Sequence, residues 1–367
     1  MTAATSAATS AAASSTRHRH IDAFRGLLMA HMALDHASMF YNAERWGGAE
    51  LATHAPGAPA DMAQFLTRFS GVAVAPGFCF MAGFMAATTS AARERRGVPS
   101  GEISQRLIIR GLVLIAADAL IAGLPRLFMG FYSFMVLSCL GVSLIAIALL
   151  RHVKTPILLA LAVAIIVFHP LMEFPSAIDW ILHTPSREGF LRSLYPVFPW
   201  FGVMLFGFVV GRDSVTRKRL SRFWVGAAVS CLLGFFAVRL PGGFGNAYTH
   251  DGIGALNFWF FSKYPPDLAW LSWSFWQIFL ALAVLRQLTT ERCPPILEVL
   301  SVFGRVSFFF YLTHFYVLAL AMPLVHGGHS LGFVYAVWLL LLALMYKPCQ
   351  WYLSKKTTRG NLITRYI

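Results

Sequence analysis

The sequence predicts an all-α integral membrane protein with about ten transmembrane helices, and three observations lead to this fold class. Among its 367 residues, 57% are hydrophobic and 13% are charged, about half the charged fraction of a soluble domain. Its mean hydropathy is +0.63. Apolar stretches of about 20 residues, the length that crosses a bilayer as a helix, recur from residue 22 to residue 352. We therefore expect a single membrane domain over residues 17–352.

The two ends of the chain are expected to lie outside this domain. Residues 1–16 are Ala, Ser and Thr after the first Met and lack the bulk to bury apolar surface, which predicts a disordered tail. A cleaved signal peptide would begin with basic residues and end with small ones. Here the small residues precede Arg17 and Arg19, so we expect the first apolar segment to be retained as a helix. Residues 353–367 are expected to form a basic cytoplasmic tail.

The predicted spans are joined by loops whose charge alternates along the chain. With the N-terminus in the cytoplasm, the inner loops hold roughly three basic residues for each one in the outer loops. Both termini are therefore predicted to be cytoplasmic. The same bias accounts for the net charge of +14 without a nucleic acid partner. The expected spans cover residues 22–41, 69–91, 104–124, 129–150, 155–172, 194–211, 220–240, 267–288, 303–325 and 330–352.

The first span carries ionisable residues at bilayer depth, where each is costly and is therefore a functional candidate. Arg25 and His36 are eleven positions apart, so they lie within about 20° of one helix face and about 16 Å apart along the axis. Asp22 is close enough in sequence to pair with Arg25, and Asp35 directly precedes His36. A purely structural explanation is weaker for four such residues than for a lone histidine.

The ninth span repeats this layout of an inner cation and a central histidine. Tyr311 and His314 are three positions apart and share a face, and Arg305 lies about 13 Å nearer the cytoplasm. Asp118, in the third span, has a depth similar to that of His36. It either orients this imidazole or makes a structural hydrogen bond, and the sequence leaves both open.

Two residues at the outer ends of spans are candidates to bind substrate. Lys263 lies in Ser-Lys-Tyr-Pro-Pro before the eighth span, and Trp200 opens the sixth span after two prolines. The alternatives are a lysine that snorkels to the interface and an ordinary helix start. The longer outer loops, at 42–68, 173–193 and 241–266, are expected to select the substrate.

Several short motifs occur in order along the chain. They are Ile-Asp-Ala-Phe-Arg-Gly (21–26), Met-Ala-Leu-Asp-His (32–36), Leu-Thr-Arg-Phe (66–69), Ala-Pro-Gly-Phe-Cys-Phe-Met-Ala-Gly (75–83), Tyr-Pro-Val-Phe-Pro-Trp-Phe-Gly-Val-Met-Leu-Phe-Gly (195–207), Ser-Lys-Tyr-Pro-Pro (262–266) and Phe-Gly-Arg-Val-Ser-Phe-Phe-Phe-Tyr-Leu-Thr-His (303–314). Together they resemble the heparan-alpha-glucosaminide N-acetyltransferase-like membrane proteins of bacteria. The spacing of Arg25 and His36 is also similar to that of the acyltransferase-3 branch of transmembrane acyltransferases.

The resemblance implies a multi-pass protein of the bacterial inner membrane. Its members are expected to move an acyl group, acetyl in particular, from cytoplasmic acyl-CoA to a hydroxyl or amine of an extracytoplasmic carbohydrate. The resemblance also implies His36 as a catalytic residue and Arg305 as a contact of the acyl donor.

The cations of the inner ends fit this chemistry, because the phosphates of acyl-CoA require positive charge. Tyr311 is a further candidate to contact the donor. The pantetheine arm, about 15–20 Å long when extended, would bring the thioester inward to the histidines. The expected phosphate-binding residues are Arg25, Arg106, Arg110 and Arg305.

A neutral histidine can take the proton of an acceptor as it attacks the thioester. We expect His36 to be this base, with His314 or Tyr311 as its partner or as the donor to the oxyanion. Asp35 or Asp118 would then hold the imidazole tautomer. A covalent acyl-histidine and direct transfer are both open.

Two other functions fit part of the pattern. A proton-coupled transporter or a flippase for lipid-linked glycans also uses intramembrane Asp and His, but the inverted repeats typical of transporters are not visible. A non-catalytic scaffold does not explain the polar residues in the spans. We expect no metal cofactor, because His326 and His329 have no carboxylate near them in sequence. The sequence leaves the oligomeric state open.

Overall fold

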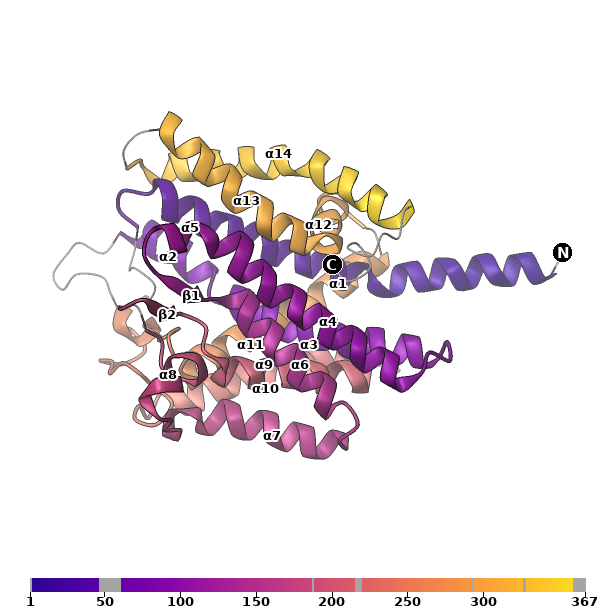
Figure 1. Cartoon of the computed structure of the whole chain (residues 1–367), viewed down its shortest axis with the longest axis horizontal. Helices are drawn as coiled ribbons and strands as arrows, with labels where there is room; N and C mark the ends of the chain where they lie inside the picture. The colour runs from indigo at the N-terminus through magenta and orange to yellow at the C-terminus, as the bar shows by residue number, and fades with distance from the viewer. Residues whose placement is uncertain are drawn as a thin grey trace.

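Helices run side by side along the long axis of the protein in the computed structural model (Figure 1). The structure describes residues 2–45, 61–186, 188–214, 220–291, 293–325 and 328–358. Helices α13 (Ser307–Ala321) and α14 (Leu331–Thr358) lie along one side, and α7 (Thr155–Phe168) and α10 (Leu220–Arg239) lie along the opposite side. Helix α1 (Thr2–Tyr41) passes between them.

The remaining elements complete this bundle in chain order. The helices are α2 (Met62–Ser70), α3 (Val74–Glu94), α4 (Ser100–Ala117), α5 (Leu124–Phe128), α6 (Val136–Leu150), α8 (Ser176–Leu182), α9 (Val197–Ser214), α11 (Leu268–Glu291) and α12 (Pro295–Arg305). The short elements are the π-helix η2 (Asp118–Ala122), the 3₁₀ turns η3 (His169–Leu171), η4 (Leu256–Trp259) and η5 (Met322–Leu324), and the strands β1 (Tyr132–Phe134) and β2 (Leu191–Ser193). The two strands pair in parallel.

The two ends of the bundle differ. We call one the basic end: here Arg106 and Arg110 of α4 and Lys356 of α14 line one cavity. We call the other the loop end: it holds α2, α8, the β1–β2 pair and the segment 240–267. These names carry no assignment to a side of a membrane.

Nine of the ten predicted spans follow a helix or consecutive helices among the described residues, whereas the span predicted over 129–150 begins with a turn and strand β1, and its helix, α6, starts only at Val136. Among the described residues, five helical segments are long and apolar enough to cross a membrane. This composition and length support an all-α membrane protein. The number of ten crossings and the cytoplasmic position of both termini stay predictions. The five segments are Met62–Glu94, Leu220–Arg239, Leu268–Thr290, Ser307–Leu324 and Leu331–Lys356.

The span predicted over residues 303–325 is interrupted beside Arg305. Helix α12 ends at Arg305 and α13 begins at Ser307, with Val306 between them at φ −120° and ψ 33°. Because the helix is interrupted there, the Arg305 side chain leaves the bundle interior and is exposed.

The first residues of the chain also differ from the expectation. The backbone of residues 2–16, predicted to be a disordered tail, continues α1 as a helix and projects beyond the bundle (Figure 1). Alanine is the strongest helix former, which favours this conformation over the coil that low bulk alone suggests. The boundaries of the tail and of the domain stay predictions.

Close crossings between helices hold the bundle together. At the α1–α12 crossing, a Cβ on Gly26 would overlap the carbonyl oxygen of Leu300, and one on Gly304 would overlap that of Asp22. Small residues at such crossings let two backbones touch, which favours helix association in lipid. This contact places Arg25 beside the α12–α13 junction.

Candidate active site

Two histidines from distant parts of the chain meet inside the bundle. His36 of α1 and His314 of α13 stack with their ring centroids 5.1 Å apart and their planes 9° apart. The Nδ1 atom of His36 lies 2.8 Å from the Nε2 atom of His314, a hydrogen-bond distance. His314 is fully buried. The two histidines that the sequence singled out are therefore direct partners.

The hydrogen bonds define which nitrogen carries the proton when both rings are neutral. The Nδ1 atom of His314 lies 2.8 Å from the carbonyl oxygen of Phe310, which can only accept. His314 therefore donates from Nδ1 and accepts at Nε2, so His36 must donate from its own Nδ1. This leaves the lone pair of His36 on Nε2, and that atom can receive a proton.

Contacts on both sides of this pair hold α1 in place. At the basic end, Arg25 donates from Nη2 to Ser307 Oγ at 2.6 Å. At the loop end, the Tyr41 hydroxyl donates to the carbonyl of Leu318 at 2.6 Å. Helices α1 and α13 are thus joined at three levels, with the imidazole pair in the middle.

Asp35 has different partners from those expected. Its carboxylate forms ion pairs with Arg45, at 2.9 Å, and with Arg68. It interacts with His36 electrostatically but does not hydrogen-bond to this ring among the described residues. The orienting partner of His36 is therefore His314, and Asp35 belongs to a charged cluster beside the pair.

Asp118 also lies away from the imidazoles. It is fully buried at the start of η2, and its Oδ2 accepts from the backbone amides of Met135, at 3.0 Å, and Ser138, at 3.1 Å. This contact holds the first turn of α6. The structure thus favours the structural alternative for Asp118 over the orientation of His36.

Aromatic side chains surround Lys263 at the loop end. Its ammonium lies over the rings of Tyr195, at 5.7 Å, and Tyr264, at 5.0 Å, within the range of cation–π attraction. Lys263 also interacts electrostatically with His36 and Asp35. It therefore lies within electrostatic range of the imidazole pair.

Tyr311 and Trp200, the other candidates of this region, lie in different surroundings. The Tyr311 ring is 6.1 Å from that of His314, on the side of Asp118 and Tyr264, and does not line the basic pocket described below. Trp200 is fully buried behind Tyr195, with ring centroids 5.2 Å apart. A substrate at the loop end would meet Tyr195 before it met Trp200.

Two buried charged residues shape the segment that carries Lys263. Arg239 donates to the carbonyls of Phe258, at 2.7 Å, and Asn257, at 2.8 Å. Asp267, just before the apolar segment of α11, accepts from three backbone amides. Burial raises the pKa of Asp267 to about 6, and these amides and Arg239 act against the rise. The segment 240–267 is thus anchored from inside.

A cavity of about 300 Å³ lies at the basic end. The four arginines predicted to bind phosphate all line it, and Arg93 and Lys356 add two cations that the sequence analysis missed. Ligand pockets of small molecules begin at about this volume. The lining consists of Arg25, Met85, Thr89, Arg93, Arg106, Leu107, Arg110, Arg305, Val306, Ser307, Phe308, Phe309, Tyr352 and Lys356.

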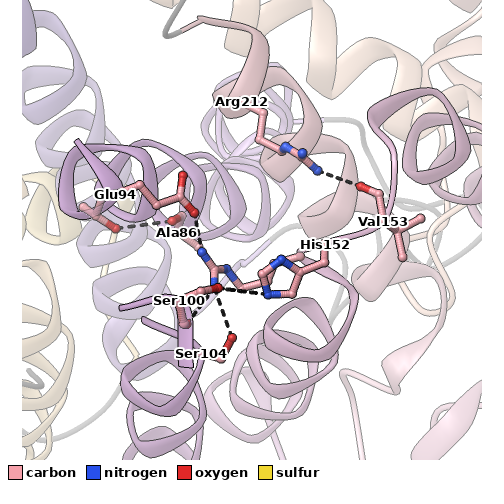
Figure 2. A network of polar contacts seen from close by, with 9 residues as sticks. Ala86, Glu94, Ser100, Ser104, His152, Val153 and Arg212 are labelled. Carbon is pink, nitrogen blue, oxygen red and sulfur yellow. Dashed lines mark hydrogen bonds and ion pairs between the residues drawn. The ribbon is translucent and has the colours of Figure 1, made fainter. Parts of the chain in front are cut away.

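A polar network joins α3 and α4 where the chain passes from one helix to the other (Figure 2). Arg151 forms an ion pair with Glu94 of α3 and donates to the Ser100 carbonyl, at 2.8 Å, and the Ser104 hydroxyl, at 3.2 Å, of α4. Because α3 and α4 both contribute cations to the pocket, this network fixes the distance between them.

Helices of membrane-spanning character, a cluster of cations and a hydrogen-bonded imidazole pair define an integral membrane protein with an internal polar site. The chain belongs to the heparan-alpha-glucosaminide N-acetyltransferase catalytic family, whose model matches residues 17–234. This membership indicates an acetyltransferase-type membrane enzyme. No curated protein matched the chain in a separate comparison.

The family match ends before part of the site. It includes Arg25, Asp35 and His36, whereas Lys263 and His314 lie beyond it. The structure joins the two parts through the imidazole pair. Among the described residues, no group of three or more His, Cys, Asp and Glu side chains is placed to hold a metal ion; His326 lies outside them.

Proposed function

We propose that the protein transfers an acetyl group from acetyl-CoA, bound at the basic end, to a hydroxyl or amine of a carbohydrate at the loop end. One observation carries this proposal: the basic pocket and the imidazole pair share α1 and α13. Arg25 and Ser307 line the pocket, and His36 and His314 lie further along the same two helices. This arrangement supports donor binding and proton transfer along one path.

The basic pocket is suited to the phosphates of the donor. Guanidinium groups form paired, charge-assisted hydrogen bonds with phosphate oxygens. From Ser307 to His314 the helix rises about 10 Å, and from Arg25 to His36 about 16 Å. An extended pantetheine arm of about 15–20 Å covers this separation. The thioester would then lie beside His36 while the phosphates stay in the pocket.

The transfer step follows from the free lone pair of His36. The acceptor oxygen or nitrogen attacks the thioester carbonyl carbon while His36 Nε2 takes its proton. His314 orients the ring and accepts from its Nδ1 throughout. Collapse of the tetrahedral intermediate breaks the carbon–sulfur bond, and the CoA thiolate regains a proton from Nε2. Tyr311, whose ring lies 6.1 Å from that of His314, would donate to the oxyanion.

The sidedness of the reaction follows from the distribution of basic residues. We propose that the basic end faces the cytoplasm of a bacterial inner membrane and the loop end faces outward, with ten crossings. Acetyl-CoA is then bound from inside, and the carbohydrate acceptor reaches His36 from outside. The loop-end segments would select the acceptor.

Binding of acetyl-CoA to the purified protein in detergent tests the donor half of the proposal. We expect measurable affinity in calorimetry and a loss of about tenfold or more in Arg110→Gln, since one charge-assisted hydrogen bond contributes about 1.5–3 kcal/mol. Arg95→Gln is the matched control, because Arg95 is exposed and does not line the basic pocket. If no acyl-CoA binds, the donor assignment is wrong and proton-coupled transport becomes the function to test.

A further inference from the structure

We propose that Phe40 and Phe315 limit the length of the acyl chain that the protein transfers, by closing the space beyond the imidazole pair to chains longer than acetyl. This inference rests on the proposed function, because it concerns the acyl group of the same donor. It is carried by the contacts of these two rings with each other and with His36.

Helices α1 and α13 run in the same direction past the imidazole pair. Starting at the basic pocket, α1 leads from Arg25 through His36 to Phe40. Helix α13 leads from Ser307 to Phe315, which directly follows the second histidine. A donor whose phosphates lie in the basic pocket would enter in this direction with its acyl chain in front. The chain would therefore point past the imidazoles toward the two phenylalanines.

The two phenylalanine rings meet just beyond the imidazole pair. The ring centroids of Phe40 and Phe315 are 5.1 Å apart, with the planes at 67°. Phe315 also stands at 90° to the ring of His36, with the centroids 5.6 Å apart. Both are edge-to-face contacts within the usual range of aromatic pairs. Side chains on a helix tilt toward its N-terminus, which for both helices is the side of the basic pocket. The rings therefore cover the imidazole pair from the loop end.

Hydrogen bonds on both sides of the phenylalanine pair keep the two helices together. Tyr41, next to Phe40, donates to the carbonyl of Leu318 at 2.6 Å. The imidazole pair joins the same two helices on the other side of the rings. Because α1 and α13 are tied at both levels, the rings cannot separate by a movement of the helices. A longer acyl chain would have to displace a ring.

The distances fit a limit at a short acyl chain. Phe40 lies four positions beyond His36, which is about 6 Å along the helix. Its side chain tilts back over part of this rise. A hexanoyl chain has four more carbons than an acetyl group, which extends it by about 5 Å. The space between the imidazoles and the rings would hold an acetyl methyl group but not the hexanoyl chain.

The acceptor would use a different approach. The segment 240–267 carries Lys263, which interacts electrostatically with His36, and Tyr264, which interacts in the same way with Tyr311. The phenylalanine pair belongs to α1 and α13 and not to this segment. Closing the line along the two helices would therefore leave the side of Lys263 for the acceptor.

Acetyl-CoA, butyryl-CoA and hexanoyl-CoA, which differ only in acyl chain length, test the inference on the purified full-length protein. Binding is measured by calorimetry, and transfer of each labelled acyl group to D-glucosamine is followed alongside. We expect the wild type to bind hexanoyl-CoA about tenfold or more weakly than acetyl-CoA, with butyryl-CoA between them. The kcat/KM for transfer should fall in the same order.

Substitutions assign the limit to the two rings. Phe315→Ala should bind hexanoyl-CoA about tenfold more tightly than the wild type does, because the chain fills the space that the ring leaves. Phe40→Ala should act in the same direction, and Phe315→Leu, which fills part of the space, should lie between Phe315→Ala and the wild type. Phe128→Ala, which removes an exposed ring of α5, is the matched control and should not change the preference. Acetyl-CoA affinity within about threefold of wild type would show that each variant is folded.

The outcomes separate this inference from the proposed function. If acetyl-CoA binds but the wild type binds hexanoyl-CoA equally well, the inference is overturned and the donor assignment stands. The same holds if the preference for acetyl-CoA survives in both Phe315→Ala and Phe40→Ala. If no acyl-CoA binds, the proposed function fails and the inference fails with it.

Discussion

The basic end and the loop end of α1 and α13 both contain cations, but they use them differently. At the basic end, six cations line an open cavity of about 300 Å³. At the loop end, cations surround one carboxylate next to a hydrogen-bonded imidazole pair. An open cluster suits a large, hydrated polyanion, whereas a connected, hydrogen-bonded cluster suits proton transfer. The contrast separates binding from chemistry within one pair of helices.

The largest effect is expected where the two ends depend on the same packing contact. In Gly304→Leu the new side chain would overlap the backbone of α1 at Asp22, which should cost several kcal/mol or prevent folding. We expect loss of acetyl-CoA binding and of transfer together, with a lowered midpoint in thermal unfolding. Gly226→Leu is the control, since a Cβ there meets open space. A stable Gly304→Leu protein with normal transfer would contradict the tight α1–α12 crossing.

A loop-end substitution should separate chemistry from binding. In His314→Ala, His36 loses the acceptor that fixes its tautomer, and we expect kcat to fall by about 100-fold with acetyl-CoA affinity unchanged. His314→Gln keeps an oxygen that can accept from His36 Nδ1 and should recover part of the rate. Equal rates in the two variants would mean that the hydrogen bond does not orient His36.

A substitution at the basic end should change KM more than kcat, the opposite of the effect expected for His314→Ala. In Arg25→Gln the pocket loses one cation and Ser307 loses its partner, so we expect the KM for acetyl-CoA to rise about tenfold while kcat changes less. Steady-state kinetics over a range of acetyl-CoA concentrations measures this split. A fall in kcat with KM unchanged would move Arg25 from donor binding to the chemical step.

The smallest effect on transfer is expected at Asp118. Asp118→Asn keeps an oxygen that can accept from the backbone amides of α6, so the rate should stay within a few-fold of wild type. The thermal midpoint should fall by a few degrees, because a neutral amide is a weaker acceptor than a carboxylate. A rate loss of 100-fold or more in a stable variant would contradict the structural role of Asp118 and indicate a catalytic one.

Helical periodicity explains what the sequence could predict of the site. It aligns Arg25 with His36 and Tyr311 with His314, because each pair lies in one continuous segment. A second rule located the four arginines of the basic pocket: basic residues gather at the helix ends on one side of the membrane.

Contacts between segments could not be derived in this way. His36 and His314 are 278 positions apart, so only the packed bundle shows that they are partners. Asp35 directly precedes His36, yet its carboxylate is taken by arginines from beyond α1. Arg93 and Lys356 resemble ordinary charges at helix ends until α3 and α14 bring them to one cavity. The break at Val306 depends on local backbone geometry, and the apolar pattern of residues 303–325 does not predict it.

The most direct test of the account measures binding and transfer in His36→Ala. Acetyl-CoA affinity is determined by calorimetry, and transfer of labelled acetyl to D-glucosamine, which offers hydroxyl and amine groups, is followed in wild type and variant. We predict wild-type affinity for acetyl-CoA and a transfer rate at least about 100-fold lower, because the donor pocket is intact and the proton acceptor is gone. Transfer at the wild-type rate in this variant would contradict the assignment of His36 as the base.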